Sequence, residues 1–164
     1  LQAASELRQT HPGFRLVIFG EGYLGNQLRA QAASLGLGDV VQFAGYRDDL
    51  EDFVGCFDLF VHPSSAEGLG VAALKAAAAG HAVVGCRAGG MRESVVDGET
   101  GLLVEPEDAD ALCHAIARLM NEDVLRASMC YAGRERMQNE FSIAKMADRH
   151  VAVYESLLKE GEQT

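Results

Sequence analysis

Leu59 to Gly80, with the sequence LFVHPSSAEGLGVAALKAAAAG, is the stretch that decides the fold of this chain. It begins with a short apolar run that predicts a buried strand, and Pro63-Ser64-Ser65 ends that run. Gly68-Leu69-Gly70 then permits a tight turn into an Ala-rich helix, predicted over Val71–Ala79 and stopped by Gly80. A helix that begins at such a turn presents free backbone N–H groups and the positive end of its dipole, which suits an anion such as a diphosphate.

Two further glycine turns follow predicted strands. Gly20-Glu21-Gly22 comes directly after the first apolar strand, and Gly89-Gly90 follows the strand predicted over Ala82–Cys86. A single carboxylate, Glu67, lies at the mouth of the central turn. In a parallel sheet, ligands bind beyond the carboxyl ends of the strands. We therefore expect Gly20, Glu67 and Gly89 to line one crevice.

Strands alternate with helices along the chain, a pattern typical of a parallel sheet with helices on both faces. Strands are predicted over residues 15–19, 40–43, 57–61, 82–86 and 101–104. The predicted helices end near residues 10, 35, 54, 79, 95, 120, 139 and 158, and Ser142 is the predicted cap of the last one. The fold class is therefore α/β, a Rossmann-like domain with a helical C-terminal tail, and 164 residues predict a single domain.

Composition and charge exclude several classes of function. The chain carries 24 acidic residues against 14 Lys and Arg, a formal charge of −10, which argues against a nucleic-acid or anionic-membrane surface. No segment reaches the roughly 18 apolar residues of a membrane span, so no transmembrane segment is expected. The histidines are scattered and the cysteines form no Cys-x-x-Cys pair, so we expect no metal and a reducing, cytoplasmic location. The four cysteines are Cys56, Cys86, Cys113 and Cys130.

The first glycine turn supports two interpretations. Gly20-x-Gly22-x-x-Gly25, between a strand and a helix, matches the dinucleotide fingerprint, which keeps an NAD-dependent oxidoreductase domain as a hypothesis. Such a site also needs an acidic residue at the end of the second strand to hold the ribose, and that position is Phe43-Ala44-Gly45 here. Close approach of another ligand is the favoured interpretation. His62 and His81 are single histidines, for which we expect structural roles.

With these turns placed, the chain resembles the C-terminal, donor-binding domain of the glycogen-synthase-like (group 1) family of retaining glycosyltransferases, which have the GT-B fold. The resemblance covers about residues 10–120, in the family's order and spacing. It is carried by RLVIFGEGYLGNQLRAQAASLGL (15–37), VVQFAGY (40–46), FDLFVHPSSAEGLGVAALKAAAAG (57–80) and AVVGCRAGGMRESVVDGETGLLV (82–104). It implies a nucleoside diphosphate sugar as donor substrate, no separate cofactor, and an N-terminal acceptor domain in the same protein.

The resemblance also implies roles for individual residues. Backbone groups at Tyr46 and Arg47 would read the nucleotide base, and Glu67 would contact hydroxyls of the transferred sugar as the carboxylate of the catalytic site. The amides of the central glycine turn would face the diphosphate. The full set of implied donor-binding residues is Gly20, Gly22, Tyr46, Arg47, Gly68, Leu69, Gly70, Lys75, Gly89 and Gly90.

Lys75 departs from the family pattern, which has a second Glu eight residues after the first to bind the donor ribose. A lysine only donates hydrogen bonds where a carboxylate accepts them. We therefore expect weakened or altered donor binding, with Lys75 either near a phosphate or facing solvent. A catalytically degraded binding module of glycosyltransferase type is the alternative hypothesis that follows.

The chain starts at Leu1 inside a helix-like pattern, and we expect it to be a piece of a longer, two-domain enzyme. The family's basic pair for the diphosphate and its acceptor domain lie upstream of this point. The fragment of residues 1–164 is accordingly expected to be inactive alone.

Overall fold

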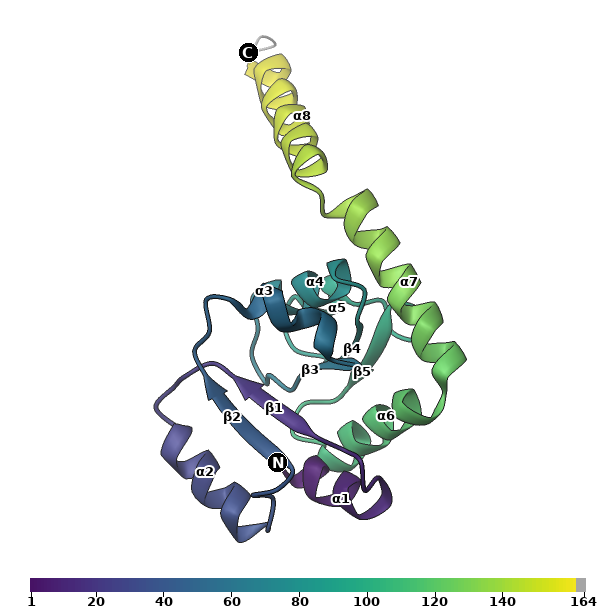
Figure 1. Cartoon of the computed structure of the whole chain (residues 1–164). Helices are drawn as coiled ribbons and strands as arrows, with labels where there is room; N and C mark the ends of the chain where they lie inside the picture. Colours follow the sequence, from purple (N-terminus) through teal and green to yellow (C-terminus); the bar gives the residue numbers. More distant parts are fainter. Residues whose placement is uncertain (162–164) are drawn as a thin grey trace.

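The structure is a computed structural model, and it describes residues 1–161 (Figure 1). Its strands are β1 (Leu16–Phe19), β2 (Val41–Gly45), β3 (Leu59–His62), β4 (Ala82–Cys86) and β5 (Gly101–Val104). Its helices are α1 (Gln2–Thr10), α2 (Gly25–Ser34), α3 (Leu50–Phe53), α4 (Val71–Ala78), α5 (Met91–Ser94), α6 (Ala109–Asn121), α7 (Asp123–Glu140) and α8 (Ile143–Gly161), with a 3-10 turn η1 at Val54–Cys56. The predicted α/β class is confirmed, and β4 and β5 have the bounds that the sequence predicted.

All the strand pairs are parallel, and they form two ladders. β1 pairs with β2, and β4 lies between β3 and β5. Every residue of β4 is buried, because this strand has a neighbour on each side and helices over each face. The prediction of a buried strand over residues 59–61 is wrong in one respect. β3 is half-buried along its length, because it is the edge strand of its ladder.

The core is built on the two faces of β4. Successive side chains of a strand point to opposite faces, so Val84 packs on one side with Leu7 of α1 and Leu119 of α6. Val83 packs on the other side with Met91 of α5 and with the small side chains of α4. The Ala-rich sequence of α4 therefore lets this helix lie close to the sheet. A third cluster lies between α2 and the β1–β2 ladder.

The two C-terminal helices differ in how they meet the domain. α7 packs against α4 and contributes the buried Met129 and Met137, whereas α8 projects away from the rest of the molecule (Figure 1). Ser142 caps α8 as predicted, because its Oγ accepts a hydrogen bond of 3.3 Å from the backbone N–H of Lys145. Over residues 1–161, no helix combines the length and the apolar character that a membrane crossing requires.

Candidate functional site

The turns that follow β3 and β4 pack directly against each other. The Gly90 N–H donates a hydrogen bond of 2.7 Å to the carbonyl oxygen of Gly68. A Cβ on Gly90 would lie 2.0 Å from that same oxygen, and one on Gly89 would lie 1.8 Å from the carbonyl oxygen of Glu67. Both distances are far below any van der Waals contact, so only glycine fits at these two positions. Two of the three predicted glycine turns therefore meet at the carboxyl ends of their strands.

Helix α5 packs against the glycine turn that precedes α4. Ser94 is buried, and its hydroxyl donates a hydrogen bond to the carbonyl oxygen of Leu69. Gly70 has a φ of 76°, in the left-handed region that favours glycine, and a Cβ there would lie 2.6 Å from the sulfur of Met91. The glycine turn before α4 is consequently fixed both by its own backbone conformation and by the side chains beneath it.

Glu67 accepts hydrogen bonds at both carboxylate oxygens. Nε2 of His62 lies 2.7 Å from Oε2, while Oε1 accepts from the N–H groups of Gly68 and Gly70 at 3.1 and 3.3 Å. The family resemblance implies that the amides of this turn face the diphosphate, which stays a prediction; in this structure the N–H groups of Gly68 and Gly70 donate to Glu67. The cause is the tight turn, which folds the glycine N–H groups back onto the nearest carboxylate.

The surroundings of Glu67 favour its charged form. The hydrogen bond from His62 is the main cause that lowers the pKa of the Glu67 carboxyl below its ordinary value. Partial burial opposes this effect, and the N–H groups of Gly68 and Gly70 reinforce it. Glu67 is therefore a carboxylate at neutral pH and acts as a hydrogen-bond acceptor.

His62 is the residue of this site that sequence reasoning missed. It is the last residue of β3, and a structural role was expected for it. The contact with Glu67 spans five residues, across a turn in which the Ser64 hydroxyl donates to the carbonyl oxygen of Ala66 at 2.5 Å. A histidine at the end of a strand, followed by Pro63 and then by a lone carboxylate, was the available signal.

The first glycine turn packs against the last residue of β2, Gly45. The Gly20 N–H donates to the carbonyl oxygen of Gly45 at 2.8 Å, and a Cβ on Gly45 would lie 3.2 Å from a carboxylate oxygen of Glu21. Gly22 has open space around its Cα. Gly20 thus contacts the end of β2, whereas Glu67 and Gly89 contact each other. A single crevice lined by Gly20, Glu67 and Gly89 together stays a prediction.

Tyr46 and Arg47 follow β2 at the same end of the ladder. The Tyr46 side chain is 72% exposed. The Arg47 guanidinium binds both carboxylate oxygens of Asp49, at 2.6 and 2.5 Å, and lies 4.8 Å from the ring centre of Phe53. This fork of hydrogen bonds lowers the pKa of the Asp49 carboxyl. Arg47 borders a cavity of about 260 Å³, whose other lining residues are Val17, Phe19, Gln42, Ala44, Phe53 and Phe57.

Lys75 lies one turn into α4 and has an exposed side chain. The helix begins at Val71 after Gly70, which has no side chain with which to cap it. The cap position therefore supplies no side-chain acceptor to the first N–H groups of α4. Lys75 is on the same short helix as these groups, at the position where the family resemblance implies a ribose-binding Glu.

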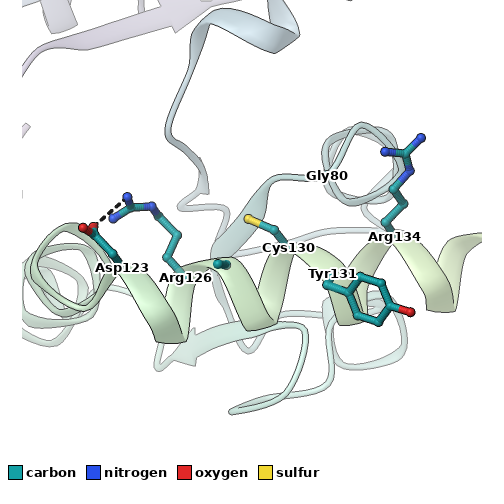
Figure 2. A pocket seen from close by; sticks show the side chains of 7 residues that line it. Gly80, Asp123, Arg126, Cys130, Tyr131 and Arg134 are labelled. Carbon is teal, nitrogen blue, oxygen red and sulfur yellow. Dashed lines mark ion pairs between the residues drawn. The ribbon is translucent and has the colours of Figure 1, made fainter.

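A second hollow lies beside α7, near the start of β4 (Figure 2). It measures about 480 Å³ and follows one side of α7, where Asp123 and Arg126 form an ion pair of 2.8 Å. Gly80 borders it and precedes β4, whereas the Gly89 turn comes after β4. The five residues of β4 separate these two ends by about 16 Å. The hollow is therefore not part of the candidate site; its remaining lining residues are Ala127, Cys130, Tyr131 and Arg134.

Comparison with known proteins identifies the family. The family model described as glycosyl transferases group 1 matches residues 1–136. The chain belongs to this family. Lipopolysaccharide core biosynthesis glycosyltransferase LpsE of Rhizobium meliloti (strain 1021) is 34% identical to this group 1 glycosyltransferase chain over 145 residues, 88% of this chain and 43% of LpsE. The chain thus spans less than half the length of that curated relative.

Solved structures share the fold, among them one of a glycosyl transferase group 1 family protein, LpcC. The C-terminal domain of LpcC from Francisella tularensis is 26% identical with a TM-score of 0.79, over 87% of this chain and 77% of that one. Anabaena HepE in complex with UDP is 25% identical with a TM-score of 0.85, over 94% of this chain and 44% of that one. The architecture described above is that of the C-terminal half of a GT-B glycosyltransferase.

Proposed function

We propose that this chain is the donor-binding domain of a retaining glycosyltransferase that transfers a hexosyl group from a nucleoside diphosphate sugar. The observation that carries the proposal is the packed pair of glycine turns, which holds the ionised Glu67 beside the start of α4. Binding of UDP by HepE supports the choice of ligand class. The acceptor would lie on an N-terminal domain of the same protein, in the cytoplasm, and residues 1–164 alone would not turn over.

The proposed chemistry needs positioning and charge stabilisation from this domain. In a retaining transfer the departing phosphate takes the proton of the acceptor on the same face of the sugar. The N–H groups at the start of α4, which have no side-chain cap, would stabilise the diphosphate as it leaves. Glu67 would hold the hexose through its hydroxyls, and Gly20, Gly22, Tyr46 and Arg47 would border the nucleotide.

Isothermal titration of the full-length protein tests this proposal. We expect that at least one of UDP-glucose, ADP-glucose and GDP-mannose binds. Gly89→Ala should weaken that binding, because the new Cβ would separate the two turns, and Gly38→Ala is the control because no atom lies within 4 Å of its added Cβ. Failure of all three ligands to bind the wild-type protein would overturn the proposal.

A catalytically degraded binding module is the second candidate, and Lys75 is the observation that favours it. If the missing ribose contact limits binding, Lys75→Glu should tighten binding of the nucleoside diphosphate by about tenfold, the effect of one hydrogen bond to a charged acceptor. Titration of UDP, ADP and GDP into the wild type and this variant measures the change. Equal affinities would mean that the side chain at position 75 takes no part in binding.

A further inference from the structure

The contact between His62 and Glu67 has a fixed direction. An ionised carboxylate only accepts hydrogen bonds, so the His62 nitrogen at 2.7 Å from Oε2 must carry the proton. Both side chains are three-quarters or more buried, with 21% of His62 and 25% of Glu67 exposed. The imidazole ring also lies nearly parallel to the ring of Phe60 on the same strand, with the ring centres 6.2 Å apart. His62 therefore donates from a largely buried position beside Phe60.

The Glu67 carboxylate has more lone-pair positions than the donors named above occupy. A carboxylate has about four lone-pair positions, two on each oxygen. The N–H groups of Gly68 and Gly70 occupy those of Oε1, and His62 occupies one on Oε2. After these contacts of the described residues, one acceptor position remains, on Oε2. Because three donors from two different segments fix the carboxylate, that position has a defined direction.

We propose that His62 is a positioning residue of the donor site: its Nε2–H holds the Glu67 carboxylate so that one acceptor position, on Oε2, is directed at a hydroxyl of the donor hexose. This inference rests on the proposed function, in which the hexose lies against Glu67. Among the contacts of the described residues, His62 supplies the one side-chain donor to Oε2. Without it the carboxylate is held only at Oε1, by the N–H groups of Gly68 and Gly70, and Oε2 is no longer fixed in direction. The hexose would then lose its aligned acceptor, while the nucleotide and diphosphate would keep their contacts.

Two substitutions separate positioning from packing. The side-chain amide nitrogen of glutamine reaches about as far from the backbone as Nε2 of histidine, whereas that of asparagine stops at the level of Nδ1. His62→Gln therefore keeps a donor for Oε2, and His62→Asn removes it, although both variants are neutral and polar. A role limited to packing would affect both variants alike.

The experiment is isothermal titration of the full-length protein with three matched pairs of probes: UDP and UDP-glucose, ADP and ADP-glucose, GDP and GDP-mannose. The quantity to compare is the dissociation constant of the nucleoside diphosphate divided by that of the corresponding nucleoside diphosphate sugar. This ratio reports the affinity that the sugar adds. We expect the sugar to tighten wild-type binding and His62→Asn to reduce that ratio about tenfold, the effect of one hydrogen bond to a charged acceptor. His62→Gln should keep it, and the affinity for the nucleoside diphosphate alone should stay within about twofold throughout.

The outcomes distinguish the two proposals. If the wild type binds none of the six probes, the proposed function fails and the inference fails with it. If the wild type binds but His62→Asn keeps the ratio, or if the sugar adds no affinity in the wild type, only the inference is overturned. An equal loss in both variants, accompanied by weaker binding of the nucleoside diphosphate, assigns His62 to packing and also overturns it.

Discussion

Glu107 has an unfavourable backbone conformation. Among residues 1–161 it is the only residue other than glycine with a positive φ, at 65°. A side chain in the left-handed region costs about 1 kcal/mol, because Cβ approaches the following carbonyl oxygen. We predict that Glu107→Gly raises the free energy of unfolding by about 0.5–1 kcal/mol, measured by urea denaturation. Glu99→Gly is the control: its φ is not positive, so it should lower stability, and a gain of equal size there would contradict this explanation.

At the same scale, Glu67 should couple stability to pH. Its pKa is lowered in the folded protein, chiefly by the His62 hydrogen bond, and returns to its ordinary value on unfolding. The stabilisation is thus present above that ordinary value, about 4.5, and is lost as the pH falls through the lower, folded-state pKa. We predict that Glu67→Gln is less stable than the wild type at pH 7 and that this difference shrinks on acidification below about pH 4.5. Thermal unfolding from pH 7 to pH 3 measures it, and parallel curves would contradict the assignment.

Local sequence predicts where the strands lie, but it predicts only some of the contacts between the turns that follow them. β4 and β5 are short apolar runs between glycine turns, so their bounds could be predicted. The meeting of Glu67 with Gly89 also follows, because the ends of neighbouring parallel strands lie together. The separation into two ladders depends on long-range pairing that no local pattern contains. The His62 contact depends on the conformation of the Pro63 turn, which fixes the direction of both side chains.

The candidate site depends on the contact between the glycine turn after β3 and the glycine turn after β4. Gly90→Ala would place a Cβ 2.0 Å from the Gly68 carbonyl oxygen, which also accepts the Gly90 N–H. We predict a loss of about 1–3 kcal/mol in the free energy of unfolding, the usual effect of overpacking. Gly25→Ala is the matched control, because it has open space at the start of α2 and alanine favours a helix. Equal losses in the two variants would mean that the turns do not pack as described.

At the scale of the whole molecule, α7 links the C-terminal tail to the site. The Arg136 guanidinium donates a hydrogen bond of 3.0 Å to the carbonyl oxygen of Ser94, whose hydroxyl in turn donates to Leu69 of the central glycine turn. Phe141, directly after α7, packs against the same core cluster as Met137. The tail is therefore part of the domain up to Phe141, and the turn at residue 142 is where it leaves.

Helix α8 adds an apolar surface and no core contact. None of the three core clusters of the described residues includes a residue of α8, and several of its large apolar side chains are more than half exposed: Ile143, Met146, Tyr154, Leu157 and Leu158. We predict that ending the chain after Phe141 changes the free energy of unfolding by less than about 0.5 kcal/mol, as for a surface change. Ending it after Asn121 should unfold the domain, because Met129 and Met137 are then lost from the core.

Self-association, measured by sedimentation velocity, should fall when α8 is removed, since an exposed apolar stripe of this kind favours contact between copies. A large loss of stability in the chain that ends after Phe141 would mean that α8 folds back onto the domain in solution.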